Sequence, residues 1–355
     1  MPLVKLGYLL VHIRSGPRGE QAVAEVQAAE AAGYDSVWVN ESYGSDAISM
    51  LGWLAPQTAS IGLGAAIMPA PARAPAAAAM AGATLDTLSG GRFIFGFGPS
   101  GPQVSEGWYG VPYVRPWGRV REYVEVVRAI LRREGPLEHS GPHYAIPVCG
   151  EGTTNQGKPL KLNFLPRRHE IPVYLGAIGR KSVELCAEIA DGWIPAYFDP
   201  DSWESLWGEH LEAGFERGGR SRAGLAVSPT VQVAIGGDLE TARTGARMRM
   251  TLYLGGMGSR QFNFYGELAR RMGYGDVADR VQELFLAGKK EAAFNSVPDE
   301  MLDRVCLLGG EDEVAAGLRR LEAAGVDRVI AIPVHADPAE RLHTIRRLGV
   351  IAGAA

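Results

Sequence analysis

Short runs of hydrophobic residues recur along the chain, and the segments between them carry hydrophobic residues three or four positions apart. Short runs are typical of strands buried on both faces, whereas the longer spacing is typical of helices with one buried face. The pattern predicts strands at residues 4–11, 35–40, 61–67, 92–98, 171–176, 192–197, 225–235 and 327–333. It predicts helices at residues 20–32, 47–58, 76–88, 119–133, 180–190, 200–217, 298–306, 312–324 and 339–347.

The alternation of strand and helix determines how the strands run. Each helix returns the chain to the same end of the sheet, so consecutive strands are parallel. Eight such units close naturally into a (β/α)8 TIM barrel, and we expect this α/β fold as a single domain over residues 1–355. An open, doubly wound sheet is the alternative. Two long segments, at about residues 134–170 and 239–296, interrupt the alternation and are interpreted as insertions.

The composition limits the class of protein and its partners. Of the 355 residues, 46% are hydrophobic and 21% are charged, which excludes a disordered or fibrous chain. The formal net charge of -4 argues against a nucleic-acid binder, and no apolar run is long enough to predict a membrane span. Cys149, Cys186 and Cys306 show no paired spacing, so we expect a cytoplasmic protein without a disulfide framework or a zinc site.

In a TIM barrel the reactive groups lie at the carboxyl ends of the strands. Here those ends are rich in glycine and other small residues, and they carry no Ser, His and Asp set of a hydrolase. His139 and His143 flank Gly141 and Pro142, so they cannot share a helix face as a pair of metal ligands. We therefore expect no metal site, and instead a close approach of the backbone to a planar or phosphorylated ligand.

The sequence GAIGRKS at residues 176–182 is the first candidate ligand-binding loop. A strand ends here, glycines bracket two small residues, and a helix begins. Amide groups at a helix N-terminus favour an anion, and Arg180 and Lys181 add positive charge. The loop is either a phosphate site or an ordinary turn between a strand and a helix, and the pattern alone does not separate the two.

A second glycine-rich loop, at residues 96–101, matches the dinucleotide-binding pattern G-x-G-x-x-G. Pro99 and Pro102 argue against a helix directly after this loop, and the strand before it is the fourth of the chain rather than the first of a βαβ unit. We therefore interpret the loop as the lining of a pocket at the end of a strand.

Several segments resemble a known family. GGRF at residues 90–93 and SGPQVSEGWYG at residues 100–110 are similar to luciferase-like flavin and deazaflavin oxidoreductases. The second segment is closest to the branch that uses coenzyme F420 and includes methylenetetrahydromethanopterin reductase. Further similar segments are residues 33–38, 61–64 with Pro69, Arg73 and Pro75, 157–161, 171–177 and 190–193. The resemblance runs through most of residues 1–235, resumes near Asp299, and implies a TIM barrel with insertions.

The resemblance also implies a site for coenzyme F420, with FMN as the alternative, at the mouth of the barrel. The family holds the cofactor ring against a bulge with a non-prolyl cis peptide bond, which maps to Ala66–Ile67 or to Ala65–Ala66 here. The phosphate would lie at residues 176–179 and the ribityl chain beside residues 100–103. The implied cofactor-binding residues are Asn40, Ala65, Ala66, Ile67, Gly98, Ser100, Gly101, Gln103, Gly176, Ala177, Ile178, Gly179 and Arg180.

The reaction that the resemblance implies is transfer of a hydride between C5 of the deazaflavin and a small organic substrate that the sequence does not identify. Because the cofactor carries the chemistry, no protein nucleophile is required. Glu41 is the candidate proton donor, and His12 could reach the substrate from the first strand. An FMN-dependent luciferase-like monooxygenase and a non-catalytic flavin- or deazaflavin-binding protein remain the alternatives.

The roles of the two insertions stay open. Lys158, Lys161, Arg167 and Arg168 in the first either meet the acidic tail of the cofactor or are solvated surface charges, and the second interpretation is favoured because this segment starts at the amino-end face of the barrel. The second insertion follows the carboxyl end of a strand, so it either caps the mouth or only packs as helices. The resemblance further implies a homodimer formed through the helix at residues 76–88.

Overall fold

The computed structural model describes residues 4–11, 19–259, 261 and 263–354, and it contains a sheet in which every strand pair is parallel. The hydrogen-bonded order is β10-β9-β8-β5-β3-β2-β1-β13-β11-β12, with β4 beside β5. The strands are β1 (Lys5–Leu10), β2 (Ser36–Val39), β3 (Gly62–Ala65), β4 (Met68–Pro69), β5 (Phe93–Gly98), β8 (Val173–Leu175), β9 (Gly192–Trp193), β10 (Ala226–Val227), β11 (Thr230–Ile235), β12 (Cys306–Gly309) and β13 (Arg328–Pro333). The predicted parallel α/β sheet is therefore confirmed.

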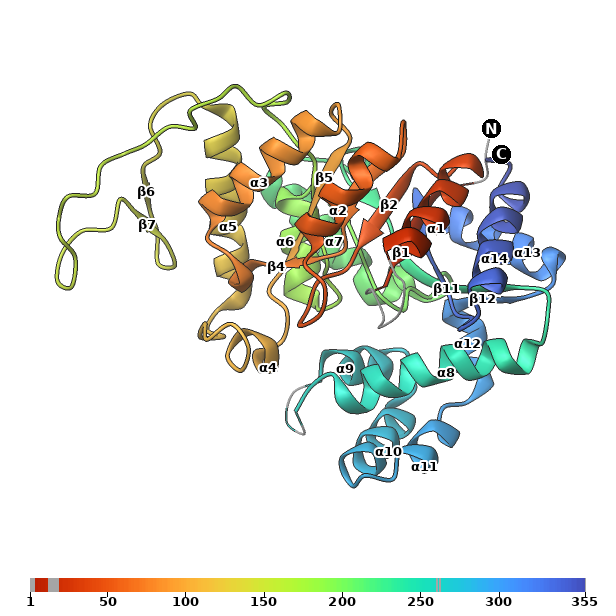
Figure 1. Ribbon diagram of the computed structural model, residues 1–355. Coiled ribbons are helices and arrows are strands. Elements are labelled where there is room, and N and C mark those ends of the chain that lie inside the picture. Colours follow the sequence, from red (N-terminus) through yellow and green to blue (C-terminus); the bar gives the residue numbers. More distant parts are fainter. Residues whose placement is uncertain (1–3, 12–18, 260, 262, 355) are drawn as a thin grey trace.

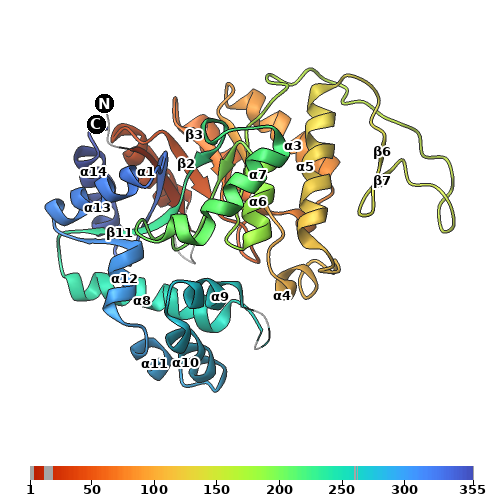
Figure 2. The same cartoon turned by 180° about the vertical axis from the view of Figure 1, so that it is seen from behind.

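The helices between the strands cover the outside of this sheet (Figures 1 and 2). They are α1 (Gly19–Ala31), α2 (Ala47–Leu54), α3 (Pro75–Leu88), α5 (Pro116–Arg132), α6 (Arg180–Ile189), α7 (Glu209–Gly218), α13 (Glu311–Ala323) and α14 (Pro338–Ile351). The short helix α4 (Pro102–Ser105) instead lies beyond the end of β5. Shorter helical turns occur at Ala55–Gln57, Ala70–Ala72, Glu204–Gly208 and Arg222–Gly224. In the part of the chain that the structure describes, no helix is both long and apolar enough to cross a membrane.

Alternate residues of each strand point to opposite faces of the sheet, and this separates two apolar clusters. Val37 and Val39 pack outward into the large core under the helices, whereas Trp38 points inward. The inward cluster consists of Leu9, Trp38, Tyr174, Ile194, Ile330 and Ile332. A Cβ atom on Gly64 would overlap the ring of Trp38, and one on Gly192 would overlap the ring of Tyr174. These glycines are required because two large rings fill the space between the strands.

At the amino ends of the strands, a buried cation closes the inner space. Arg328 donates to both carboxylate oxygens of Asp35, at 2.8 and 2.6 Å, and to the hydroxyl of Tyr174 at 3.0 Å. Its guanidinium also lies over the rings of Trp38 and Tyr174, 5.7 Å from each centroid. Burial alone would lower the pKa of Arg328, but the hydrogen bonds and charge of Asp35 outweigh burial and raise it. The positive charge of Arg328 is therefore balanced by the carboxylate of Asp35 inside the sheet.

Several predicted elements differ from the structure. The predicted strand at residues 192–197 is reduced to Gly192–Trp193, and the predicted helix at residues 200–217 begins only at Glu204. The predicted strand at residues 61–67 ends at Ala65, and β4 resumes after a bulge with a cis Ala66–Ile67 bond. Ser228 and Pro229 divide the predicted strand at residues 225–235 into β10 and β11, because proline cannot donate a ladder hydrogen bond. The predicted helix at residues 298–306 ends at Val305, and Cys306 begins β12, a strand that the pattern did not predict.

The first insertion forms an arm that stands away from the body in both views of the ribbon (Figures 1 and 2). It contains a hairpin of β6 (His139–Ser140) and β7 (Ala145–Ile146), and of residues 134–170 only Pro166 is buried. The buried carboxylate of Glu122 on α5 anchors the hairpin, since it accepts from the amides of His143 and Tyr144 at 3.1 and 3.0 Å. His139 and His143 lie on this hairpin rather than on a helix, as predicted.

The second insertion forms a helical block over the carboxyl ends of the strands. Its helices are α8 (Leu239–Gly256), α9 (Phe264–Arg271), α10 (Gly275–Leu286) and α11 (Lys290–Asn295), and α12 (Asp299–Val305) follows it. In Figure 1 it lies below the sheet, on the same side as α4, which directly follows the end of β5. The block is therefore placed at the mouth, as one of the two interpretations of this segment required.

Candidate active site

The carboxyl ends of β3, β5 and β8 together form an apolar floor, which consists of Ile67, Gly98 and Gly176. A Cβ atom on Gly98 would lie 2.8 Å from Cδ1 of Ile67, and one on Gly176 would lie 3.0 Å from its Cγ2. Both glycines are thus needed for Ile67 to lie where it does. Ile67 and Ala66 are only partly buried and border the inward cluster. The cis bond lies at Ala66–Ile67, the first of the two positions that the resemblance implied.

Two predicted residues directly follow the end of β2. Asn40 is partly exposed, whereas the side chain of Glu41 is only 6% exposed. Glu41 accepts from Nη2 of Arg73 at 2.6 Å and from the amide of Ala47 at 3.4 Å. Burial raises the pKa of Glu41 above its usual value, although the hydrogen bond and charge of Arg73 oppose this. Glu41 is therefore a buried carboxyl group at the end of β2, held by Arg73 and by the start of α2.

Arg73 and Tyr123 extend this polar cluster, and the sequence analysis did not assign either of them to the site. Nη1 of Arg73 and the hydroxyl of Tyr123 are buried, and neither has a hydrogen-bond partner among the described residues. Asp46, which caps α2, lies 3.7 Å from Nη2 of Arg73. Arg73 belonged to one of the segments that resemble the family, which was the available signal. Nothing in the sequence marked Tyr123 as a site residue, because it is only one of the regularly spaced apolar positions of the predicted helix at residues 119–133.

The loop after β5 adopts a conformation that fits its predicted place at the pocket edge. Ser100 has a φ of 62°, and its carbonyl accepts from the hydroxyl of Tyr113 at 3.0 Å. Gln103 is exposed, and Gly101 is partly buried. Pro102 begins α4 directly after the loop, so the argument from Pro99 and Pro102 against a helix here was wrong. Proline is tolerated in the first turn, where its missing N–H group would have no helical partner.

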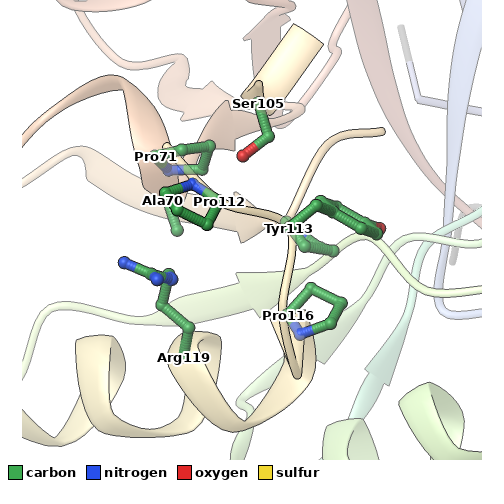
Figure 3. Close-up of a pocket in the computed structure, with 8 residues that line it drawn as sticks. Ala70, Pro71, Ser105, Pro112, Tyr113, Pro116 and Arg119 are labelled. Carbon is green, nitrogen blue, oxygen red and sulfur yellow. The ribbon is translucent and has the colours of Figure 1, made fainter. Parts of the chain in front are cut away.

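A small pocket lies under this loop (Figure 3). It is lined by Ala70, Pro71, Pro99, Ser105, Pro112, Tyr113, Pro116 and Arg119. Its volume of about 10 Å³ corresponds to about one water molecule, so it cannot hold a tricyclic ring. The floor on Ile67, and not this pocket, is the surface that is suited to a flat ligand.

The predicted phosphate loop, residues 176–180, leads from β8 into α6. Gly179 and Arg180 are exposed at the start of the helix, and the amide of Gly179 donates to Oγ of Ser182 at 3.0 Å. Ala177 is buried, and its carbonyl accepts from Nε1 of Trp193 at 2.7 Å. The exposed end of the loop can hold an anion, because the first amides of a helix lack partners within the helix.

The structure brings most of the predicted site residues to the same end of the sheet but orients them differently. Asn40, Ala66, Ile67 and Gly176 are partly exposed at the mouth, whereas Ala65 and Ala177 pack outward into the large core. His12 lies outside the described residues. Among the described residues, no three His, Cys, Asp or Glu side chains gather as a metal site.

His335, after β13, was also absent from the predicted set. It is only 9% exposed, and its Nδ1 has no partner among the residues that the structure describes. Burial lowers the pKa of its imidazole. The position after the last strand was the available signal, because such ends carry the reactive groups of barrels.

The chain is similar to known proteins along most of its length. A family model described as luciferase-like monooxygenase matches residues 7–328. Rv3520c of Mycobacterium tuberculosis, provisionally named a coenzyme F420-dependent oxidoreductase, is 43% identical over 97% of this chain and 99% of its own length. A 5,10-methylenetetrahydromethanopterin reductase of Archaeoglobus fulgidus is 30% identical over 86% of this chain and 87% of its own.

A solved structure shares the fold. The coenzyme F420-dependent tetrahydromethanopterin reductase of Methanopyrus kandleri superposes with a TM-score of 0.79, at 24% identity, over 98% of this chain and 97% of that one. Because the family model covers most of the sequence and a relative is similar along nearly the whole length, the chain belongs to the luciferase-like monooxygenase family.

Proposed function

We propose that this protein is a coenzyme F420-dependent oxidoreductase acting on a small organic substrate. The observation that carries the proposal is the apolar floor at Ile67, where glycines at the ends of β5 and β8 leave room for its side chain, in a chain similar to proteins with F420-dependent names. When bound, the deazaflavin supplies or accepts a hydride at its C5 carbon. The protein then has to hold the ring, exclude water and present the substrate.

The residues present fit such a cofactor. Ile67 and Ala66 would support one face of the ring, since no side chain from Gly98 or Gly176 rises beside them. Asn40 would contact the ring edge. Ser100, Gly101 and Gln103 would lie beside the ribityl chain, and the start of α6 from Gly176 to Arg180 would hold the phosphate.

Glu41 and His12 remain the proposed proton-handling groups. The raised pKa of Glu41 supports a role as proton donor, because a buried carboxyl keeps its proton to higher pH. Its ion pair with Arg73 supports a different role, in which it positions the end of β2 beside the ring. Replacement by glutamine separates the two roles, as described in the Discussion.

We infer further that the sheet closes into a complete barrel. β10 pairs with β9 and β11 pairs with β13, and only Ser228 and Pro229 separate β10 from β11. The amide of Thr230 also donates to the carbonyl of Pro195 at 3.0 Å, across the same junction. These contacts support eight strand positions around one inner space, with β12 paired beside β11.

The proposed function is tested by titrating the purified protein with F420 and with FMN. Binding of F420 at least about tenfold tighter than FMN supports the deazaflavin assignment, and a reduced-F420 screen of acceptors then identifies the substrate class. Tighter binding of FMN with oxygen consumption would instead make the protein a monooxygenase. F420 binding without hydride transfer to any acceptor would favour a non-catalytic carrier.

We also propose a homodimer. The accessible surface of the chain is 15977 Å², whereas a folded monomer of 38.0 kDa exposes about 14,000 Å². The excess of about 2,000 Å² is more than one partner contributes to a typical stable interface. The arm carries the exposed side chains of Val148, Leu160 and Leu165, and α3 exposes Met80 and Leu88. Light scattering after size exclusion should give twice 38.0 kDa, and a single-chain mass would contradict the dimer.

A further inference from the structure

Three tyrosine rings meet where the helical block faces the region after β9. Tyr197 directly follows Ala196, which forms a parallel bridge with Thr230 beyond the end of β9. Its ring packs edge-on against Tyr253 of α8 and Tyr265 of α9, with centroids 5.7 and 6.0 Å away. The rings of Tyr253 and Tyr265 lie 4.6 Å from each other. We call these three rings the tyrosine cluster, which joins a strand end to the helical block.

The hydroxyl of Tyr197 is a buried hydrogen-bond donor without a partner. It forms no hydrogen bond with any of the residues that the structure describes. Buried tyrosine hydroxyls usually have a partner, because an unpaired one has lost its water without compensation. The φ of 52° at Tyr197 is also uncommon for a bulky residue. An unpaired donor on a strained backbone is more typical of a ligand site than of a packed core.

A positive charge lies next to the tyrosine cluster. Nη2 of Arg249 donates to the hydroxyl of Tyr253 at 3.2 Å, and the guanidinium lies 5.2 Å from the centroid of that ring. Burial raises the pKa of Tyr197 well above its usual value, so its hydroxyl keeps the proton at neutral pH. Among the nearby groups, Arg249 lowers this pKa, whereas Tyr253, Tyr265 and Cys306 raise it. The hydroxyl can therefore donate to an oxygen, and Arg249 favours negative charge on that oxygen.

The tyrosine cluster borders open space. Each of the three tyrosines and Arg249 is partly exposed, although the hydroxyl of Tyr197 itself is buried. The helical block that carries two of the rings lies at the carboxyl ends of the strands, where barrel enzymes bind their substrates (Figure 1). Tyrosine rings offer a large apolar surface that suits another flat ring. The cluster therefore fits an aromatic ligand that carries a hydrogen-bond acceptor.

We propose that Tyr197 is a further catalytic residue, which donates its hydroxyl proton to the carbonyl oxygen of an aromatic ketone or aldehyde held by Tyr253 and Tyr265. The proposal rests on the proposed function and names its substrate class. A C–H bond forms between the carbonyl carbon and the hydride of the reduced deazaflavin, and the π electrons move onto the oxygen. That oxygen takes the proton of Tyr197. The products are an alcohol, the oxidised deazaflavin and a tyrosinate, which regains a proton from water.

A matched pair of probes tests the hydrogen bond without turnover. Acetophenone carries the acceptor oxygen, whereas α-methylstyrene has nearly the same shape with a CH₂ group in its place. Tyr197→Phe should weaken binding of acetophenone about tenfold and change binding of α-methylstyrene less than about twofold. Saturation-transfer NMR measures both affinities, on the protein with and without F420. Tyr274→Phe at the start of α10 is the control, because its hydroxyl already donates to Oε1 of Glu300, and it should leave both affinities unchanged.

Two further measurements separate a catalytic role of Tyr197 from a structural one. Because Tyr197→Phe removes a buried donor without a partner, its free energy of unfolding in urea should be unchanged or higher. Its kcat with reduced F420 and an aromatic ketone should fall about 100-fold, while its affinity for F420 changes less than about twofold. A less stable variant would show that the hydroxyl bonds within the protein, which contradicts the proposal.

The proposal is overturned if Tyr197→Phe binds acetophenone like the unmodified protein. It is also overturned if reduced F420 passes its hydride to other acceptors but to no aromatic ketone or aldehyde. Failure of the proposed function looks different, because the unmodified protein would then not bind F420 at all. In that case, the two probes still test the hydroxyl of Tyr197 on the protein without cofactor.

Discussion

The two ends of the parallel sheet are built for opposite purposes. At the amino ends, Arg328 is paired with Asp35 and Tyr174, and large rings fill the space around it. At the carboxyl ends, Ile67 lies over Gly98 and Gly176, partly exposed, and orphaned polar atoms such as Nη1 of Arg73 lie nearby. Matched charges and tight packing stabilise one end, while open apolar surface and unmatched polar groups prepare the other for a ligand.

The largest effect that would test this comparison is on stability. Arg328→Gln should lower the free energy of unfolding by about 3 kcal/mol, because it leaves the Asp35 carboxylate without its cation inside the sheet. Urea unfolding measures this loss, and the double variant Asp35→Asn, Arg328→Gln should recover part of it. A loss below about 1 kcal/mol would show that the amino end does not depend on the pair.

An intermediate effect is expected on cofactor binding. Gly98→Ala adds a Cβ atom 2.8 Å from Cδ1 of Ile67, so Ile67 must move and the floor loses its shape. F420 binding should weaken about tenfold, with a loss of stability of about 1 kcal/mol. Gly52→Ala on α2 is the control, since a Cβ atom there meets nothing within 4 Å. Equal affinity in both variants would mean that the floor does not contact the cofactor.

The smallest effect concerns pH. Because burial raises the pKa of Glu41, the folded protein holds this proton more tightly than the unfolded chain does. The resulting stabilisation is present below the ordinary glutamate pKa of about 4.3 and is lost as the pH rises through the raised pKa. Glu41→Gln keeps the neutral shape, so stability relative to this variant should fall as the pH rises above about 4.

If the difference in free energy of unfolding between the unmodified protein and Glu41→Gln is the same at every pH, the raised pKa is contradicted. Once a substrate is known, the same variant also separates the two roles of Glu41. A proton donor gives a pH profile of turnover with a limb that glutamine abolishes, whereas a positioning residue gives a profile that glutamine leaves unchanged.

The sequence predicted the features that depend on local pattern. Runs such as residues 92–98 and 327–333 could be assigned because a buried parallel strand is a short apolar run with helices on either side. Strands β9 and β10 have only two residues each, and their neighbours rather than their own residues define them. β12 begins at Cys306 without a turn after α12, so no break in the pattern marked it.

The residues of the candidate site could be predicted only where a segment resembled the family. The position of the cis Ala66–Ile67 bond followed from the family resemblance. The pairing of Asp35 with Arg328 joins residues 293 positions apart, and that of Glu41 with Arg73 depends on the direction in which each side chain points. Neither charge pair has a sequence signature.

The most direct test of the central claim is a crystal structure of the protein with F420 bound. The account predicts that one face of the deazaflavin ring lies within van der Waals distance of Ile67, between Gly98 and Gly176, with its phosphate at the start of α6. A ring bound elsewhere, or one whose face does not touch Ile67, would contradict it.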